Sequence, residues 1–387
     1  MKVLIINDGK YCSNWGLNAS TKAILELLGE IQVEFDTILH KDLHKKYTLD
    51  PELFGRRLFN EDSRLQKKFF SRYLRIPLTS DQYDLYCNLW SKGKGGTFSN
   101  VVIEKILKSD LVLYNAEGST YRNNYGSLAG LFIIYFAKKI LKKRSCFVNG
   151  SFTVSSVNNL YEGIAKRLDR EGIKFYVREE KSKESLSSIK VQSEVIPDSV
   201  FYYASSPSYN KNSDYFAVSK SMLPMLIDKD NYRLDPFIEL ISDISDLTGL
   251  KPLLLAKDPE DKYLLTLKNK LSSSLPSLSS AANFLQVQEL ISNSRFLVSG
   301  RYHHLIFAAN TSLNICCFSS SSHKIEGLAK LLSSENYSIP TFDPTDILNY
   351  KNEILKYCQS LLSIDTSWDQ FQLKKKFTEK FTKILYE

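Results

Sequence analysis

The sequence predicts an α/β protein of two domains, each built on a parallel sheet covered by helices. The chain has 387 residues, more than one hydrophobic core usually organises, so we expect two domains. Short apolar strands alternate with amphipathic helices, which is the pattern of parallel sheets with helices on both faces. This alternation stops near residues 201–214 and then restarts. The break divides the chain into two units of the same kind.

The first half of the chain contains the predicted elements of one domain. Apolar residues recur at helical spacing over residues 19–28, which predicts a helix there. Residues 45–98 are rich in charged and aromatic side chains, and we interpret them as an insertion of helices and loops. Short apolar segments predict strands at residues 3–6, 33–39, 111–114, 146–148 and 174–177.

The second half repeats the pattern after the segment FYYASSPSYNKNSD, which we interpret as the interdomain connection. Strands are predicted at 215–218, 252–256, 295–298 and 313–318, and helices at 235–248, 287–292, 347–362 and from 367 onward. We therefore predict an N-terminal Rossmann-like domain at 1–205, a C-terminal Rossmann-like domain at 206–345, and C-terminal helices at 346–387 that pack back across the domains. Two such domains facing a cleft form a GT-B-like architecture.

Composition excludes several classes of protein. With 43% hydrophobic and 24% charged residues, the chain is typical of an ordinary globular protein. Its start, MKVLIINDGK, is typical of a strand and lacks the features of a signal peptide. The longest apolar run, residues 128–137, is shorter than the ~20 residues of a membrane-spanning helix. The cysteines show no CxxC pair and no zinc spacing. We expect a soluble, cytoplasmic protein with reduced thiols and no metal site.

The charge balance leaves two interpretations open. Lys and Arg number 51 against 43 Asp and Glu, a net charge of +8, with clusters at 138–139, 142–144 and 374–376. Solvated helix faces and helix C-termini are the simpler explanation. Peripheral contact with an anionic membrane surface is the alternative. No motif or aromatic-basic pattern indicates nucleic-acid binding.

The strongest local signal is SGRYHH at residues 299–304, between a predicted strand and the apolar helix 305–309. A helix start after Gly300 presents free backbone N–H groups, which form an anion site. Arg301 adds a planar fork that matches phosphate or carboxylate. His303 adds a group that exchanges a proton near neutral pH. The alternative is that Arg301 pairs with an acidic neighbour and that one of the two histidines belongs to the core.

Two further charged residues follow predicted strands of the first domain. Arg178 lies in VREEKS at 177–182, and Glu117 lies in NAEGST at 115–120. Ligands of open α/β sheets bind at the carboxyl ends of the strands, so both residues could face a shared cleft. Arg178 taken alone is also typical of a solvated charge cluster, and Glu117 could serve as the anion at a helix terminus.

Several of these segments resemble, in chain order, the motifs of polysaccharide pyruvyl transferases. Those enzymes move a carboxyethylidene group from phosphoenolpyruvate onto two hydroxyls of a sugar and release phosphate. NAEGST departs from the glycine-rich turn of many members and is closer to an Asn-Gly-Glu-Gly-Thr variant, so a different donor or acceptor stays open. The resemblance rests on Asn7-Asp8-Gly9, Asn14-x-Gly16-x-Asn18-Ala19, VREEKS, PDSVF at 197–201, SGRYHHLIFAANT at 299–311 and HKIEGL at 323–328.

The resemblance implies roles for individual residues. His303 would be the general acid or base, protonating the donor methylene or taking a sugar hydroxyl proton, with Glu117 as the second catalytic candidate. Phosphoenolpyruvate carries two anionic groups and needs at least two cations. The candidate donor-binding residues are Arg178, Gly300, Arg301 and Lys324. The candidate acceptor-binding residues are Asp8, Asn14, Asn115 and Ser119.

We expect the protein to transfer a pyruvyl group to a sugar of a cell-surface glycan or of its precursor, without a cofactor. The acceptor would be a sugar or a lipid-linked glycan. The first alternative is a GT-B-type glycosyltransferase that uses a nucleotide-activated sugar; there Arg301 would hold the nucleotide phosphate and Glu117 would be the acceptor base. The second alternative is a non-catalytic glycan-binding protein. The identity of the donor separates the three hypotheses, and the oligomeric state is open.

Overall fold

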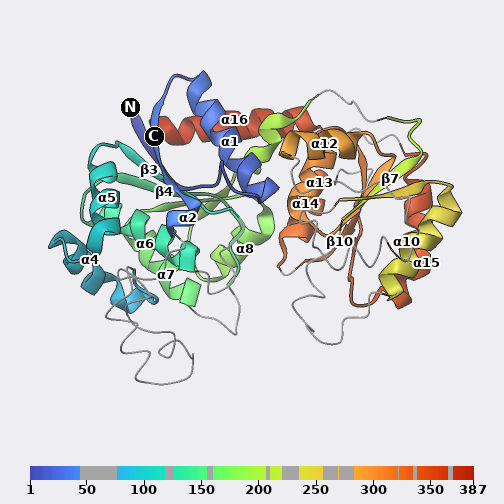
Figure 1. The fold of residues 1–387 in the computed structure, drawn as a ribbon. Coiled ribbons are helices and arrows are strands. Elements are labelled where there is room, and N and C mark those ends of the chain that lie inside the picture. The colour runs from blue at the N-terminus through green and yellow to red at the C-terminus, as the bar shows by residue number, and fades with distance from the viewer. Residues whose placement is uncertain are drawn as a thin grey trace.

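The structure, a computed structural model, describes residues 1–43, 76–117, 125–154, 160–205, 210–219, 235–255, 269, 283–320, 322–333, 338–364 and 369–387. Its strands form two parallel sheets, the first from strands between residues 2 and 195 and the second from strands between 215 and 342 (Figure 1). The predicted fold class, two Rossmann-like α/β domains, is confirmed. Of the predicted insertion at 45–98, residues 45–75 lie outside the described residues.

The first sheet has the strand order β2-β1-β3-β4-β5-β6, and every neighbouring pair is parallel. The order reverses between β1 and β3, which is where open α/β sheets place a ligand at the carboxyl ends. The strands are β1 (Lys2–Asp8), β2 (Glu34–Leu39), β3 (Leu111–Asn115), β4 (Arg144–Gly150), β5 (Lys174–Val177) and β6 (Ser193–Val195).

Helices cover both faces of the first sheet. Val3 and Ile5 of β1 face the layer of α1 (Trp15–Glu30) and α16 (Gln370–Tyr386), and Leu4 and Ile6 face the opposite layer. The opposite layer contains α4 (Tyr83–Ser91), α5 (Gly96–Leu107), α6 (Tyr125–Lys139), α7 (Leu160–Arg170) and α8 (Glu180–Ser188). Of the short elements, α2 (His40–Leu43) contacts α6, η3 (Ser80–Gln82) contacts α4 and α7, and η4 (Ser199–Tyr203) packs against α1 and α16.

The longest apolar run of the sequence lies in α6. Every residue from 125 to 137 is buried in the core of the first domain, so the run is hydrophobic because protein surrounds the helix on all sides. Within the described part of the chain, no helix combines the length and apolarity that crossing a membrane requires.

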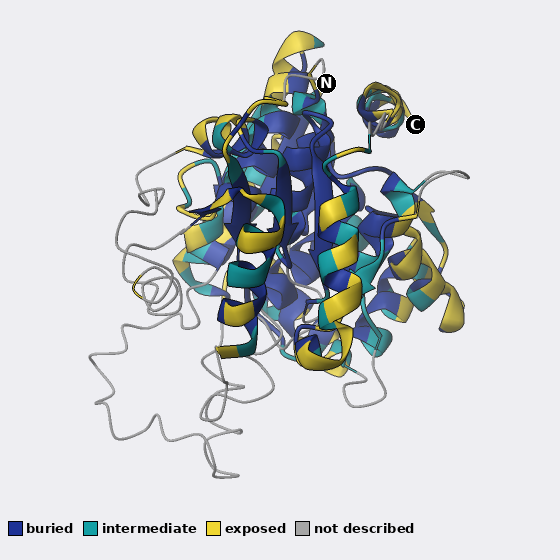
Figure 2. Ribbon diagram, turned by 90° about the vertical axis from the view of Figure 1, so that its right-hand side faces the viewer, coloured by how far each residue is buried: buried dark blue, intermediate teal, exposed yellow. Residues whose placement is uncertain are grey.

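The second sheet has the order β11-β10-β9-β7-β8, again with all pairs parallel. Its strands are buried beneath helices whose outward faces are exposed (Figure 2). The strands are β7 (Tyr215–Ser219), β8 (Lys251–Leu254), β9 (Phe296–Ser299), β10 (Asn314–Phe318) and β11 (Thr341–Phe342). One face is covered by α12 (Phe284–Ser292), α13 (Tyr302–Ala309) and α14 (Lys324–Leu332), and the other by α10 (Asp235–Thr248) and α15 (Ile347–Ser360).

The last helix, α16, contacts both domains. Leu373 packs with the core beneath α12 and α13, whereas Phe377 and Phe381 pack against the first sheet. At its C-terminal end, the guanidinium of Arg144 donates hydrogen bonds to the carbonyls of Leu385 (3.0 Å) and Ile384 (2.7 Å). The preceding helix, α15, packs against the second sheet.

The carboxyl ends of the two sheets face each other. α8 of the first domain and α14 of the second lie side by side at this interface (Figure 1). A Cβ at Gly327 of α14 would lie 3.0 Å from the Cβ of Glu179, so the helices approach closely because position 327 has no side chain. Side chains that follow the strands of one sheet therefore meet those that follow the strands of the other.

Candidate active site

Four charged or titratable side chains meet where the domains touch. Glu117, Arg178 and Asp198 follow β3, β5 and β6 of the first sheet, and His303 follows β9 of the second. His303 Nδ1 lies 3.5 Å from Glu117 Oε1, and His303 Nε2 lies 3.6 Å from Asp198 Oδ2. Arg178 Nη1 lies 2.8 Å from Asp198 Oδ2 and 4.0 Å from Glu117 Oε1. We call these four residues the interdomain cluster.

Arg178 is the buried cation of the cluster, only 1% exposed. Its Nε donates to Ser151 Oγ at 2.9 Å, and its guanidinium carbon lies 3.9 Å from the ring centre of Tyr302 in the other domain. Burial alone would lower the pKa of Arg178, but the surrounding Tyr302, Asp198 and Glu117 raise it above its ordinary value. The guanidinium therefore remains charged inside the interface.

Asp198 is the carboxylate that pairs with Arg178. It caps η4 by accepting the Val200 N–H at 2.9 Å on Oδ1, and its side chain is fully buried. Burial raises its pKa, but His303 and Arg178 outweigh that effect, and the net shift is downward. Asp198 is thus an ionised carboxylate held between a first-domain arginine and a second-domain histidine.

The two adjacent histidines occupy different surroundings. His303 packs against the first turn of α1, where a Cβ at Gly16 would lie 2.0 Å from its Nδ1. His304 is buried between aromatic rings, with its centroid 5.6 Å from Trp15 and 6.2 Å from Phe307. Burial, followed by the charges of Arg301 and His303, lowers the pKa of His304 well below its ordinary value. The ring of His303 therefore lies in the polar interface between the domains, and His304 belongs to the core.

The other predicted donor-binding residues share the carboxyl edge of the second sheet. Arg301 is the N-cap residue of α13, and its backbone N–H donates to Ser299 Oγ at 3.0 Å. Gly300 precedes it and is buried, and Lys324 is the first residue of α14. Since β9 and β10 are neighbouring parallel strands, Arg301 and Lys324 follow adjacent strand ends. Their donor-binding role stays a prediction.

The predicted acceptor-binding residues have structural partners. Asp8 is buried and accepts the Lys10 N–H at 2.9 Å, with Lys10 Nζ at 3.2 Å from its Oδ2. Asn14 caps α1 by accepting the N–H of Gly16 at 3.1 Å. Ser119 lies outside the described residues. The acceptor-binding roles of Asp8 and Asn14 stay predictions.

Asn115 belongs to a buried amide network beneath the interdomain cluster. It donates to Thr21 Oγ1 at 3.2 Å, accepts from Asn149 at 3.1 Å, and its carbonyl accepts from Asn7 at 2.7 Å. Asn7 and Asn149 have φ angles of 76° and 57°, a left-handed conformation that asparagine adopts more readily than most residues. The network ties together the carboxyl ends of β1, β3 and β4. The acceptor-binding role of Asn115 stays a prediction.

A second polar contact joins the domains beside α8 and α14. His323 Nε2 lies 3.2 Å from Ser182 Oγ and 3.8 Å from Glu179 Oε1. Burial and the nearby Lys181 lower the pKa of His323 to about 4, and burial raises the pKa of Glu179. This contact therefore combines a neutral imidazole with a hydroxyl and a carboxyl group at ordinary pH.

Three residues of the site, Asp198, Gly16 and Tyr302, were not predicted from the sequence to have a role. Asp198 and Gly16 both lie in motifs that carry the family resemblance, and these motifs were the sequence feature that could have identified them. The strand before Asp198, β6, has three residues and was not predicted. Tyr302 contacts Arg178 from the other domain, and no local pattern indicates such a contact.

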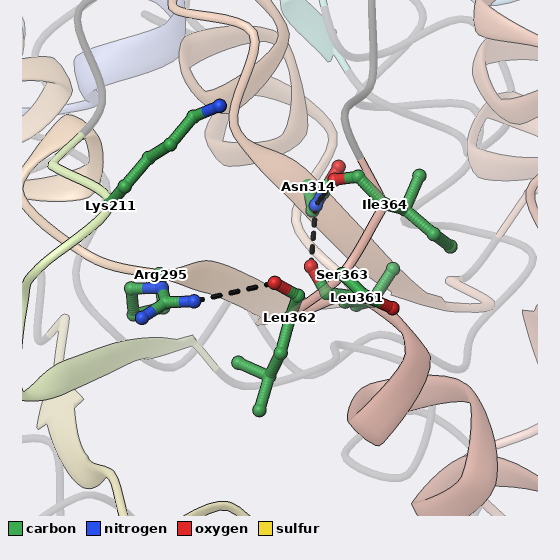
Figure 3. A pocket seen from close by; sticks show the side chains of 7 residues that line it. All are labelled: Lys211, Arg295, Asn314, Leu361, Leu362, Ser363 and Ile364. Carbon is green, nitrogen blue, oxygen red and sulfur yellow. Dashed lines mark hydrogen bonds between the residues drawn. The ribbon is translucent and has the colours of Figure 1, made fainter.

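A cavity of about 120 Å³ lies elsewhere, in the second domain (Figure 3). It is lined by Lys211, Arg295, Asn314 and residues 361–364. Arg295 and Asn314 stand at the amino ends of β9 and β10, whereas the predicted site residues follow carboxyl ends. Asn314 donates to the carbonyls of Leu361 (2.6 Å) and Ile364 (2.8 Å), so it closes this end of α15. The cavity is separate from the interdomain cluster.

All six cysteines are free thiols, and none belongs to the cluster. Among the described residues, no group of three or more His, Cys, Asp and Glu side chains is arranged to hold a metal ion.

Comparison with known proteins identifies a family model and a fold. The model described as polysaccharide pyruvyl transferase matches residues 17–322. A UDP-GlcNAc 2-epimerase from Methanocaldococcus jannaschii, solved with UDP-GlcNAc and UDP, is similar with a TM-score of 0.58 and 14% identity over 100% of this chain and 99% of that chain. The enzyme from Neisseria meningitidis bound to UDP-GlcNAc gives 0.56 and 12% over 100% of both chains. No curated protein sequence matches the chain.

At these identities the structural likeness concerns the fold alone. A further 2-epimerase, from Rickettsia bellii, gives a TM-score of 0.56 at 13% identity over 100% of this chain and 96% of that chain. The fold shared with these enzymes is the GT-B fold of two Rossmann-like domains.

Proposed function

The chain belongs to the polysaccharide pyruvyl transferase family and is a transferase, and from this premise we propose that it transfers a carboxyethylidene group from phosphoenolpyruvate to a sugar of a cell-surface glycan or its precursor. The observation that carries the proposal is the position of His303 between two carboxylates, beside a buried arginine, at the meeting of two carboxyl sheet edges. Such a site combines a proton-exchanging group with fixed charges of both signs.

The donor would lie against the second domain. The start of α13 presents backbone N–H groups, and Arg301 and Lys324 follow neighbouring strand ends, so phosphate and carboxylate groups would meet two cations and a helix N-terminus. Arg178 would add a third cation from the first domain. Because its Nε and Nη1 are engaged by Ser151 and Asp198, Nη2 is the atom through which it would hold the donor.

The reaction requires one proton to be delivered and two to be removed. Protonation of the donor methylene produces a methyl group and an electrophilic carbon, one sugar hydroxyl adds to this carbon, and the second hydroxyl displaces phosphate to close the ketal. His303 would deliver or take the proton, and Glu117, 3.5 Å from Nδ1, would exchange it with the ring or orient the acceptor hydroxyl. Of the two protons lost by the sugar, one balances the new methyl group and the other leaves with phosphate.

A glycosyltransferase using a nucleotide-activated sugar is the second candidate. The GT-B fold favours it, because the similar epimerases were solved with UDP-GlcNAc in place. In that case Arg301 would hold the nucleotide phosphate and Glu117 would be the acceptor base. Membership in a transferase family argues against the non-catalytic alternative.

A thermal-stability screen separates these donors. Phosphoenolpyruvate is compared with CMP-, UDP- and GDP-sugars, and with inorganic phosphate as a control for simple anion binding. A ligand at 100 times its Kd adds ~2.7 kcal/mol to the free energy of unfolding, which is readily measured. The proposal expects stabilisation by phosphoenolpyruvate beyond that by phosphate. Stabilisation by a nucleotide sugar alone would transfer the assignment to the glycosyltransferase.

We further propose that the acceptor is a sugar or lipid-linked glycan reached in the cytoplasm, at the surface of an anionic membrane. The basic cluster at 142–144 adjoins the C-terminal end of α16 through Arg144, and the cluster at 374–376 lies on the same helix; Lys375 and Lys383 of α16 have 73% and 69% of their side chains exposed. Part of this charge is paired with Glu379 and Glu387. Sedimentation with anionic against neutral vesicles tests the contact.

A further inference from the structure

Asp198 is the centre of the interdomain cluster. Its two oxygens have separate tasks: Oδ1 accepts the Val200 N–H, and Oδ2 accepts from Arg178 Nη1 at 2.8 Å. The same Oδ2 lies 3.6 Å from His303 Nε2. Because the carboxylate is held by bonds on both oxygens, its place relative to the imidazole is fixed by the first domain.

The surroundings of His303 leave its ring few orientations. Gly16 of α1 lies against Nδ1 so closely that a Cβ there would be 2.0 Å away. Glu117 stands 3.5 Å from Nδ1, and Tyr302 lies edge-on, with ring centroids 5.2 Å apart. The ring is therefore confined between α1 on one side and two carboxylates on the others.

His303 Nε2 is buried and makes no hydrogen bond to the described residues. A buried ring nitrogen without a partner is costly, and Asp198 Oδ2 is about half an ångström beyond hydrogen-bond range. Hydrogen bonds of catalytic groups are often long before substrate binds and tighten afterwards. Two carboxylates face the ring, but Asp198 is the one that Arg178 holds ionised by a bond of 2.8 Å, and an ionised carboxylate favours the tautomer whose proton is on the nitrogen it faces.

Resting on the proposed function, we propose that Asp198 is a positioning residue for His303: its carboxylate, held by Arg178, keeps the imidazole proton on Nε2 and directs Nδ1 toward Glu117. This division assigns different tasks to the two carboxylates. Asp198 orients the ring from the first domain, and Glu117 is the partner for proton exchange. Arg178 contributes to the same task by fixing Asp198.

The ring nitrogens of His303 report this directly, without any substrate. The chain has five histidines, so the ¹⁵N signals of labelled histidine can be assigned, with His303→Gln identifying the ring in question. At a fixed pH above neutrality, wild-type protein is expected to show the proton on Nε2. In Asp198→Asn the fraction of this tautomer should fall, since an amide presents no charge and can turn its NH₂ toward the ring.

Ser151→Ala is the matched control, because Ser151 bonds to Arg178 Nε, whereas Asp198 bonds to Nη1 and faces His303. Its ring signals should equal those of the wild type. Identical His303 signals in Asp198→Asn and wild type would overturn the proposal, as would an equal change in Ser151→Ala. If Asp198→Asn fails to fold because Arg178 is left unpaired, the double variant Arg178→Gln, Asp198→Asn removes both charges and is read in the same way.

Activity supplies a second readout. With phosphoenolpyruvate as donor, Asp198→Asn should lower kcat about tenfold or more and change KM by less than about twofold, because ring orientation matters in the transition state. Asp198→Glu, which restores the charge, should recover part of kcat. A KM effect without a kcat effect would contradict a positioning role. If the wild type does not use phosphoenolpyruvate, the proposed function fails, and the NMR result still decides the role of Asp198.

Discussion

His303 and His304 are adjacent in the chain but lie in different environments. At a helix start, successive residues point about 100° apart, so one ring can face the domain interface while the next faces the interior. The structure shows this separation: His303 stands among charges, and His304 lies between Trp15 and Phe307.

We therefore predict opposite effects of two alanine substitutions. His303→Ala should lower turnover about 100-fold or more while donor affinity and stability change little, because proton transfer is needed in the transition state. His304→Ala should act mainly on stability, because it opens a cavity between aromatic rings. Steady-state kinetics and chemical denaturation of both variants measure this. Loss of turnover in a stable His304→Ala protein with an active His303→Ala would invert the assignment.

Arg301 permits a second test at the residue scale. Arg301→Lys keeps the charge but removes the planar fork, so donor affinity should fall if the residue binds phosphate or carboxylate in a bidentate way. Lys105→Arg, at a surface ion pair of the first domain, is the control for a general effect of exchanging cations. Calorimetric titration with the donor measures both. Wild-type affinity in Arg301→Lys would remove Arg301 from the donor site.

The site residues show what a sequence can and cannot indicate. Glu117, Arg178 and His303 were predicted because each follows an apolar strand, and the structure brings these three together. Asp198 follows a strand of three residues and was missed. Gly16 contacts His303 only because α1 packs against the second domain, and contacts between distant segments leave no local pattern.

At the scale of elements, prediction succeeded where apolar runs were long enough to be fully buried. β1, β3, β9 and β10 coincide closely with predicted strands. β6 and β11 lie at sheet edges and have three and two residues, so their apolar content is too small to stand out. α1 begins at Trp15, four residues before the predicted start, because the Asn14 cap determines its first turn.

The helix α16 offers a matched pair of substitutions. Phe381 is 2% exposed and packs against the first sheet, whereas Phe371 on the same helix is 48% exposed. Phe381→Ala should lower the free energy of unfolding by about 3–5 kcal/mol, and Phe371→Ala should change it by less than about 0.5 kcal/mol. Urea denaturation of the two variants checks this. Equal effects would mean that α16 does not pack against the first domain in solution.

At the scale of the whole molecule, the contact of His323 with Ser182 and Glu179 joins the two domains and depends on pH. The folded-state pKa of His323 is lowered from 6.5 to about 4, so the unfolded chain binds a proton that the folded protein excludes. The contribution of His323 to the free energy of unfolding is therefore fully present above about pH 6.5. It is lost as the pH decreases toward 4, by at most about 3 kcal/mol. The pKa of His304 is also lowered, so His304 too makes the folded protein less stable as the pH decreases.

The variant His323→Gln isolates this contribution, because His304 is present in both proteins. It should flatten the dependence of the free energy of unfolding on pH between about 6.5 and 4, as the glutamine amide has no proton to gain. Denaturation series at several pH values measure the difference. Parallel curves for wild type and variant would show that His323 is not buried at the domain interface.

The proposed reaction is the use of phosphoenolpyruvate by the interdomain cluster to form a ketal on a glycan. The most direct measurement incubates purified protein with a glycan-precursor fraction and either phosphoenolpyruvate or nucleotide sugars, and follows both phosphate release and the mass of the acceptor. We predict phosphate release from phosphoenolpyruvate, matched by a carboxyethylidene ketal on the acceptor and abolished in His303→Ala. Nucleotide release from a nucleotide sugar, with no phosphate from phosphoenolpyruvate in the same fraction, would contradict it.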